Sequence, residues 1–153
     1  MRHAHEPQDM PTPVLLRAAQ GAYLRAVESR LAAAGMSDMP RHGPFALAGI
    51  ARHGGSLTYL TQELAVSKQA ASQLIDALAQ RGYLERHEDP DDRRRISLTL
   101  TERGRTVAHA VHEGVEWVER ELRQRIPADQ FEGLRAGLIA LCRIREEREE
   151  SGA

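Results

Sequence analysis

The chain contains little cysteine and few aromatic residues, and both scarcities limit what kind of protein it is. Cys142 is the only cysteine, so no internal disulfide can form, and we expect a reducing, cytoplasmic location. Aromatic residues make up 4% of the chain, against 41% hydrophobic residues in total. The core must therefore be built from Leu, Val, Ile and Ala, a composition typical of mainly helical domains.

Long apolar runs are also missing. None approaches the roughly 18 residues that a membrane-spanning helix requires, and residues 1–12 carry no apolar stretch of the signal-peptide kind. We therefore expect no membrane partner. Residues 1–12 are polar and contain two prolines and two histidines, which predicts a disordered N-terminal arm. Residues 13–153 have the length of one ordinary domain.

The usual signatures of catalysis are absent as well. The sequence has no glycine-rich loop for phosphates, no metal-binding quartet and no nucleophile beside an evident base. His109 and His112 have the spacing of metal ligands on a helix, but no third ligand accompanies them, and histidines on a helix surface are the better interpretation. We expect neither an enzyme nor a cofactor or metal.

The chain has no large excess of either charge, but its basic residues are clustered. The formal net charge is -1, which alone does not favour nucleic acid as a partner. Seven arginines nevertheless lie between Arg81 and Arg105, while much of the acid lies at 146–150. Because a groove-binding protein depends on local rather than total charge, this distribution permits DNA binding.

Two helices are predicted between Ser37 and Ser67. The first is capped by Ser37 or Asp38, or begins at Pro44, and it ends at Gly54. The second is short and is capped by Ser56. Together with the helix that follows, they form a helix-turn-helix pattern.

The third helix of this segment is predicted from Ser67, its N-cap, to Gly82. One face is apolar at spacings of three and four residues, and the opposite face is polar. A polar face of this kind either contacts DNA or is simply solvated, and glutamine pairs well with adenine in the major groove. Asp76 lies a turn farther along and is expected to point away from phosphate. The candidate DNA-contacting residues of the helix are Ser67, Lys68, Gln69, Ala70, Ser72 and Gln73.

A hairpin with an arginine-rich tip is predicted next. Alternation from Ile96 to Leu100 indicates a strand, and an Asp-Pro turn precedes it. Arginines at such a tip can enter a narrow minor groove, although a solvated turn with surface ion pairs is the alternative. The candidate contacts are Arg93, Arg94 and Arg95, with Arg93 first, and the residues expected to shape the turn are Asp89 and Asp92.

Helices are also predicted at both ends of the chain. The first runs from Pro13 to about Gly35, another follows Thr101 until Pro127 breaks it, and a last helix follows. Each carries an apolar stripe that must be buried against the others or against a second chain. We favour a homodimer over a monomeric helical cap, because a two-fold axis places two DNA-reading helices on adjacent major grooves.

Taken together, these motifs resemble the MarR family of bacterial transcriptional regulators. The residues that carry the resemblance are the run 60–67, the helix 68–78, Gly-Tyr-Leu-Glu-Arg at 82–86, Asp-Pro-Asp-Asp-Arg-Arg at 89–94 and Leu-Thr-Glu-Arg-Gly at 100–104. The resemblance implies a mainly α fold with a small β-hairpin wing: a winged helix-turn-helix at 37–101, with dimerisation helices at 13–36 and 102–150. It also implies a homodimeric repressor on a pseudo-palindromic DNA operator, released by a small aromatic or phenolic ligand or by an oxidant.

The sensing site is not evident from the sequence. Peroxide-sensing members of the family use a cysteine in the first helix, which this chain lacks. Cys142 lies beside Leu141 in the last helix, and we expect it to be buried as a small hydrophobe. Tyr23 and Trp117 line a ligand pocket or, as we favour, pack at an interface. The alternative to a DNA-binding regulator is a winged-helix module whose arginine tip binds an acidic protein.

Overall fold

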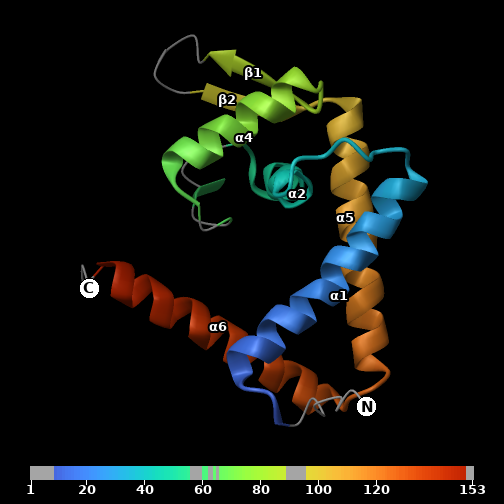
Figure 1. Cartoon of the computed structure of the whole chain (residues 1–153), viewed down its shortest axis with the longest axis vertical. Helices are drawn as coiled ribbons and strands as arrows, with labels where there is room; N and C mark the ends of the chain where they lie inside the picture. The colour runs from blue at the N-terminus through green and yellow to red at the C-terminus, as the bar shows by residue number, and fades with distance from the viewer. Residues whose placement is uncertain (1–8, 56–59, 62–63, 65, 89–95, 151–153) are drawn as a thin grey trace, which may run out of the picture. The chain divides into compact units, whose positions relative to one another are not determined.

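The structure is a computed structural model that describes residues 9–55, 60–61, 64, 66–88 and 96–150. The chain divides into two compact units, one ending at Val115 and the other beginning at Glu116, so the division falls within α5. The predicted mainly α fold with one hairpin is confirmed (Figure 1). The elements are α1 (Thr12–Ala33), α2 (Gly43–His53), α4 (Lys68–Gln80), β1 (Leu84–Glu88), β2 (Ile96–Leu100), α5 (Glu102–Arg123) and α6 (Ala128–Glu150).

The first unit is held together by an aliphatic core, as the composition predicts. Its members come from α1, α2, α4, the hairpin and the first half of α5, with Leu60 between α2 and α4. Tyr83 is the exception among these aliphatic side chains, and its ring is fully buried. The buried cluster consists of Val27, Leu31, Ala46, Leu47, Ile50, Leu60, Ile75, Leu78, Tyr83, Leu84, Leu98, Val107, Ala110 and Val111.

The start of α2 differs from one of the two predictions. Neither Ser37 nor Asp38 caps a helix, since residues 36–40 are not helical and α2 begins at Gly43. The alternative start at Pro44 is close to correct, because proline in the first helical turn lacks an N–H that the helix would leave unpaired anyway. The Asp38 carboxylate instead accepts a hydrogen bond from Tyr83.

Helix α4 has the predicted boundaries. The Ser67 side chain accepts a hydrogen bond of 3.2 Å from the backbone N–H of Ala70, which satisfies one of the unpaired donors of the first turn. At the other end, Gly82 adopts a φ of 72°, a conformation that glycine reaches without steric cost. A local cap and a local stop therefore define this helix.

The hairpin is antiparallel, and it has an additional neighbour. Its register pairs Leu84 with Leu100 at the base and Glu88 with Ile96 at the far end. Gly55 makes an isolated antiparallel bridge to Leu98, and a Cβ added at Gly55 would overlap the Leu98 side chain. Gly55 thus does more than end α2, because it allows the backbone to approach β2.

The second unit contains the end of α5 and all of α6. The predicted break at Pro127 is confirmed, and the Arg123 guanidinium lies 4.2 Å from the centre of the Phe131 ring. Phe131 is buried, but most other apolar residues of α6 are exposed. The expected burial of Cys142 is wrong, because this residue is exposed in the single chain.

None of the described helices is both long and apolar enough to cross a membrane.

Candidate nucleic-acid interface

Helix α4 exposes its polar face because its apolar face is anchored in the core. Ala71, Ile75 and Leu78 are buried. The candidate contact residues Ser67, Lys68, Gln69, Ala70 and Gln73 are exposed and Ser72 is half-buried. The first two turns therefore present a continuous polar surface, which is what a helix lying in a DNA groove requires.

The hairpin lies beside α4 (Figure 1). Leu84 and Leu98 are buried, so the strands next to α4 are fixed to the core. The predicted tip residues fall outside the described part of the chain: Arg93, Arg94 and Arg95, together with Asp89 and Asp92. The structure thus brings the base of the hairpin to α4 and does not test the tip.

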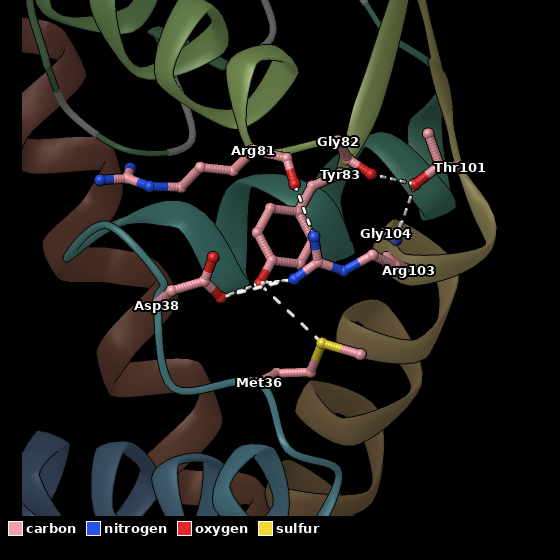
Figure 2. Close-up of polar contacts among 8 residues, drawn as sticks. All are labelled: Met36, Asp38, Arg81, Gly82, Tyr83, Thr101, Arg103 and Gly104. Atoms are coloured by element: carbon pink, nitrogen blue, oxygen red, sulfur yellow. Dashed lines mark hydrogen bonds and ion pairs between the residues drawn. The ribbon is translucent and has the colours of Figure 1, made fainter.

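A polar cluster joins three segments at the hairpin base (Figure 2). The Tyr83 hydroxyl donates a hydrogen bond to Asp38 and accepts one of 3.1 Å from Arg103. The Arg103 guanidinium also donates to the Arg81 carbonyl at 2.8 Å and lies 4.5 Å from the centre of the Tyr83 ring. The segment before α2, the start of β1 and the start of α5 are therefore held at one point.

The cluster also shifts the pKa values of Asp38 and Tyr83. The hydrogen bond from Tyr83 holds the pKa of Asp38 below its usual range, and the Arg103 cation acts in the same direction. Burial raises the pKa of the Tyr83 hydroxyl, and its hydrogen bond to Asp38 raises it further. Asp38 accordingly remains an acceptor and Tyr83 a donor around neutral pH.

The Leu-Thr-Glu-Arg-Gly motif has a structural role at the same place. The Thr101 hydroxyl donates to the Gly82 carbonyl at 2.7 Å and accepts the N–H of Gly104 at 3.1 Å. A Cβ added at Gly104 would overlap the carbonyl oxygen of Tyr83. Threonine and glycine at this spacing therefore let α5 start directly against the hairpin base.

The arginine cluster seen in the sequence is partly internal. Arg86 pairs with Asp76, Arg105 donates to the Leu100 carbonyl at 2.7 Å, and Arg103 belongs to the polar cluster described above. Counting arginines therefore overstated the charge available to DNA. The roles of Asp38 and Arg103 are not evident from the sequence, although Arg103 lies in the Leu-Thr-Glu-Arg-Gly motif.

A cavity of about 500 Å³ lies between α1, the segment 36–42 and the start of α2. Its wall is mainly apolar, and Glu28, Arg41 and His42 also line it. Neither Tyr23 nor Trp117 is part of the lining, so the pocket role considered for them does not apply to this cavity. The apolar lining residues are Leu24, Val27, Leu31, Ala32, Met36, Met39, Pro40, Pro44 and Phe45.

The remaining candidate residues lie on helix surfaces. His109 and His112 are exposed, and His109 is 3.7 Å from Glu113, in agreement with surface histidines. Within the described residues, no group of three His, Cys, Asp or Glu could hold a metal ion. Trp117 is 43% exposed, so its predicted place at an interface stays a prediction.

Comparison with known proteins agrees with this geometry. Residues 37–95 match the model of the MarR family. An uncharacterized HTH-type transcriptional regulator of Bacillus subtilis (strain 168), YwhA, is 30% identical over 87 residues, which are 56% of this chain and 63% of that protein. The chain thus spans less than two thirds of the length of this relative.

Solved structures share the fold over nearly the whole chain. A crystal structure of MarR has a TM-score of 0.71 at 21% identity and covers 97% of this chain and 99% of its own. The transcriptional regulator SlyA has a TM-score of 0.74 at 17% identity, with 93% and 100% covered. Residues 37–95 therefore match the MarR family in sequence, and the chain as a whole shares the winged-helix fold of the solved MarR and SlyA structures.

Proposed function

We propose that this chain binds double-stranded DNA as a homodimeric transcription regulator. One observation carries the proposal: α4 is anchored by buried Ala71, Ile75 and Leu78, so that its polar first turns face solvent beside a hairpin. A helix of this kind fits the major groove, and a hairpin beside it can reach the adjacent backbone or minor groove.

Each candidate residue has a proposed role that follows from its position and chemistry. Ser67 lies at the N-terminus of α4 and allows this end of the helix to face a phosphate. The free N–H groups and the helix dipole at this end favour anions. The small side chain of Ala70 allows the helix to approach the DNA bases closely. Lys68 and Ser72 contact phosphate or base edges, and Gln69 and Gln73 read bases. The proposed minor-groove contacts are Arg93, Arg94 and Arg95, held by a turn that Asp89 and Asp92 shape.

We assign dimerisation to residues 13–36 and 102–150 and DNA reading to 37–101. Large apolar side chains stay exposed on α1 and along α6, and a second copy of the chain would cover them. A two-fold dimer presents two α4 helices to a pseudo-palindromic operator. The exposed residues are Val14, Leu15, Leu16 and Leu24 on α1, and Leu134, Leu138, Ile139, Leu141 and Ile144 on α6.

We further propose that the regulator is a cytoplasmic repressor that a small aromatic or phenolic ligand releases from its operator. The apolar cavity beside α1 supports this, since its volume of about 500 Å³ is in the range of small-molecule sites. Its Arg41 and His42 edge offers hydrogen-bond donors to a hydroxyl or carboxylate.

The test is selection of a binding sequence from a pool of random DNA duplexes, followed by titration of the purified protein against salt. The proposal predicts one enriched inverted repeat, bound by a dimer with an affinity that falls steeply as salt rises. Equal, weak binding to every duplex would contradict it. Absence of binding even at low salt would favour the alternative, a module that recognises an acidic protein.

A further inference from the structure

An ion pair connects α4 to β1, and the DNA contacts proposed above do not include it. The Arg86 guanidinium donates to a carboxylate oxygen of Asp76. Asp76 lies on the third turn of α4, beyond the proposed base-reading residues, and it is the single acidic residue of that helix. The side chains are 37% exposed for Arg86 and 58% exposed for Asp76.

The position of Arg86 in the hairpin lets this pair influence the angle between the hairpin and α4. Arg86 is opposite Leu98 in the register, nearer the hairpin tip than the pair of Leu84 and Leu100. Leu84 and Leu98 are buried and fix the base. Because a two-stranded hairpin has little stability of its own, its contacts with α4 contribute to its angle to that helix.

The charges lead to the same inference. A carboxylate on a helix that lies against DNA is repelled by phosphates, and Arg86 offsets the charge of Asp76. The pair also engages the Arg86 cation, which would otherwise be available to a phosphate. An exposed pair of this kind contributes little to folding stability, so a role in positioning is separable from a role in folding.

We propose that Asp76 and Arg86 are positioning residues for DNA recognition. They set the angle between α4 and the hairpin, so that the helix and the hairpin tip reach the duplex together, and neither residue contacts DNA itself. This inference rests on the proposed function and names two residues that the function alone does not assign.

The experiment compares Asp76→Asn, Arg86→Gln and the double variant with the full-length wild-type chain. The probes are the duplex that the wild-type protein selects from a random pool and a random-sequence duplex of equal length. Fluorescence anisotropy over a series of salt concentrations gives the affinity and its salt slope for each. Glu121→Gln is the matched control for Asp76→Asn, because it removes a carboxylate from the Glu121–Arg125 pair on α5 and likewise raises the net charge by one.

We expect each single variant to bind the selected duplex about fivefold more weakly, which is the upper limit for losing an exposed ion pair, and the double variant to bind no more weakly than either. Binding to the random duplex and the salt slope should stay near wild type, and so should the control. Tighter binding by Asp76→Asn to both duplexes would overturn the inference, because it would show simple repulsion from phosphate. A slope of log affinity against log salt that is smaller by about 0.9 for Arg86→Gln would also overturn it, because it would show the loss of one phosphate contact. A wild-type chain that selects no sequence would instead contradict the proposed function.

Discussion

At the scale of single residues, Tyr83 is constrained both by burial and by its polar partners. Its ring is buried, and its hydroxyl connects Asp38 to Arg103, so three segments depend on one side chain. Tyr83→Phe removes the hydroxyl and keeps the ring. We expect it to lower the free energy of unfolding by about 1 kcal/mol, the usual net value of a hydrogen bond. Chemical denaturation of both proteins measures the difference.

The pKa of Asp38 predicts how this contact depends on pH. A pKa that is lower in the folded state means that ionised Asp38 stabilises the fold at pH values above its unfolded pKa. That contribution is lost as the pH falls through the folded pKa. Asp38→Asn should therefore melt below the wild type at neutral pH, and the two melting curves should converge in strong acid. A constant difference across that range would contradict the assignment.

Glycine at position 104 gives a second test at this scale. Gly104→Ala places a Cβ against the Tyr83 carbonyl, and we expect a loss of about 1–3 kcal/mol in the free energy of unfolding, as for other overpacked sites. Gly133→Ala is the matched control, since no atom lies within 4 Å of its added Cβ and alanine favours a helix. Equal stability of the two variants would show that the close approach at Gly104 is unimportant.

At the scale of elements, α4 is defined by its own residues. Ser67→Ala removes the cap on Ala70 and should cost about 1 kcal/mol of stability. On a chain of this size, that corresponds to a melting temperature lower by about 3 °C. Ser67→Asp, which keeps a capping oxygen, should retain the stability of the wild type, and differential scanning calorimetry can compare all three.

The same elements show how far the sequence predicts the structure. The ends of α4 were predictable because Ser67 and Gly82 act on their own neighbours. The start of α2 was not, because the partner of Asp38 is a tyrosine that lies 45 positions away. Two further features were not predictable: the bridge from Gly55 to the hairpin and the exposure of Cys142. Both depend on the tertiary arrangement, which local sequence patterns do not reveal.

In the candidate site, too, features set by local residues were predictable and features set by tertiary contacts were not. The polar face of α4 was predictable from helical spacing, and all of its candidate residues except the half-buried Ser72 are exposed. The internal partners of Arg86 and Arg103 were not, since a run of basic residues does not reveal which of them an acid or a carbonyl will engage. The roles of all candidate contacts remain predictions.

At the scale of the whole molecule, the proposed function requires a second chain. A charge on the exposed apolar face of α6 would be harmless in a monomer but would be buried in the proposed dimer. Leu138, 39% exposed in the single chain, is the residue to change. Leu138→Glu should shift the protein from dimer to monomer, because an unpaired charge in an interface is strongly unfavourable. Light scattering reports the mass, and Gln130→Glu, on the exposed start of α6, serves as the control.

Because the total charge is near neutral, DNA binding by α4 is best tested by its sequence preference and not by affinity alone. The most direct measurement is the ratio of affinities for the selected duplex and a random duplex, in the wild type and in Gln69→Ala. The account predicts a high ratio for the wild type that falls in the variant by the equivalent of about 1–3 kcal/mol, while binding to the random duplex is unchanged. A ratio that is the same in both proteins would contradict the assignment of α4 as the helix that reads DNA.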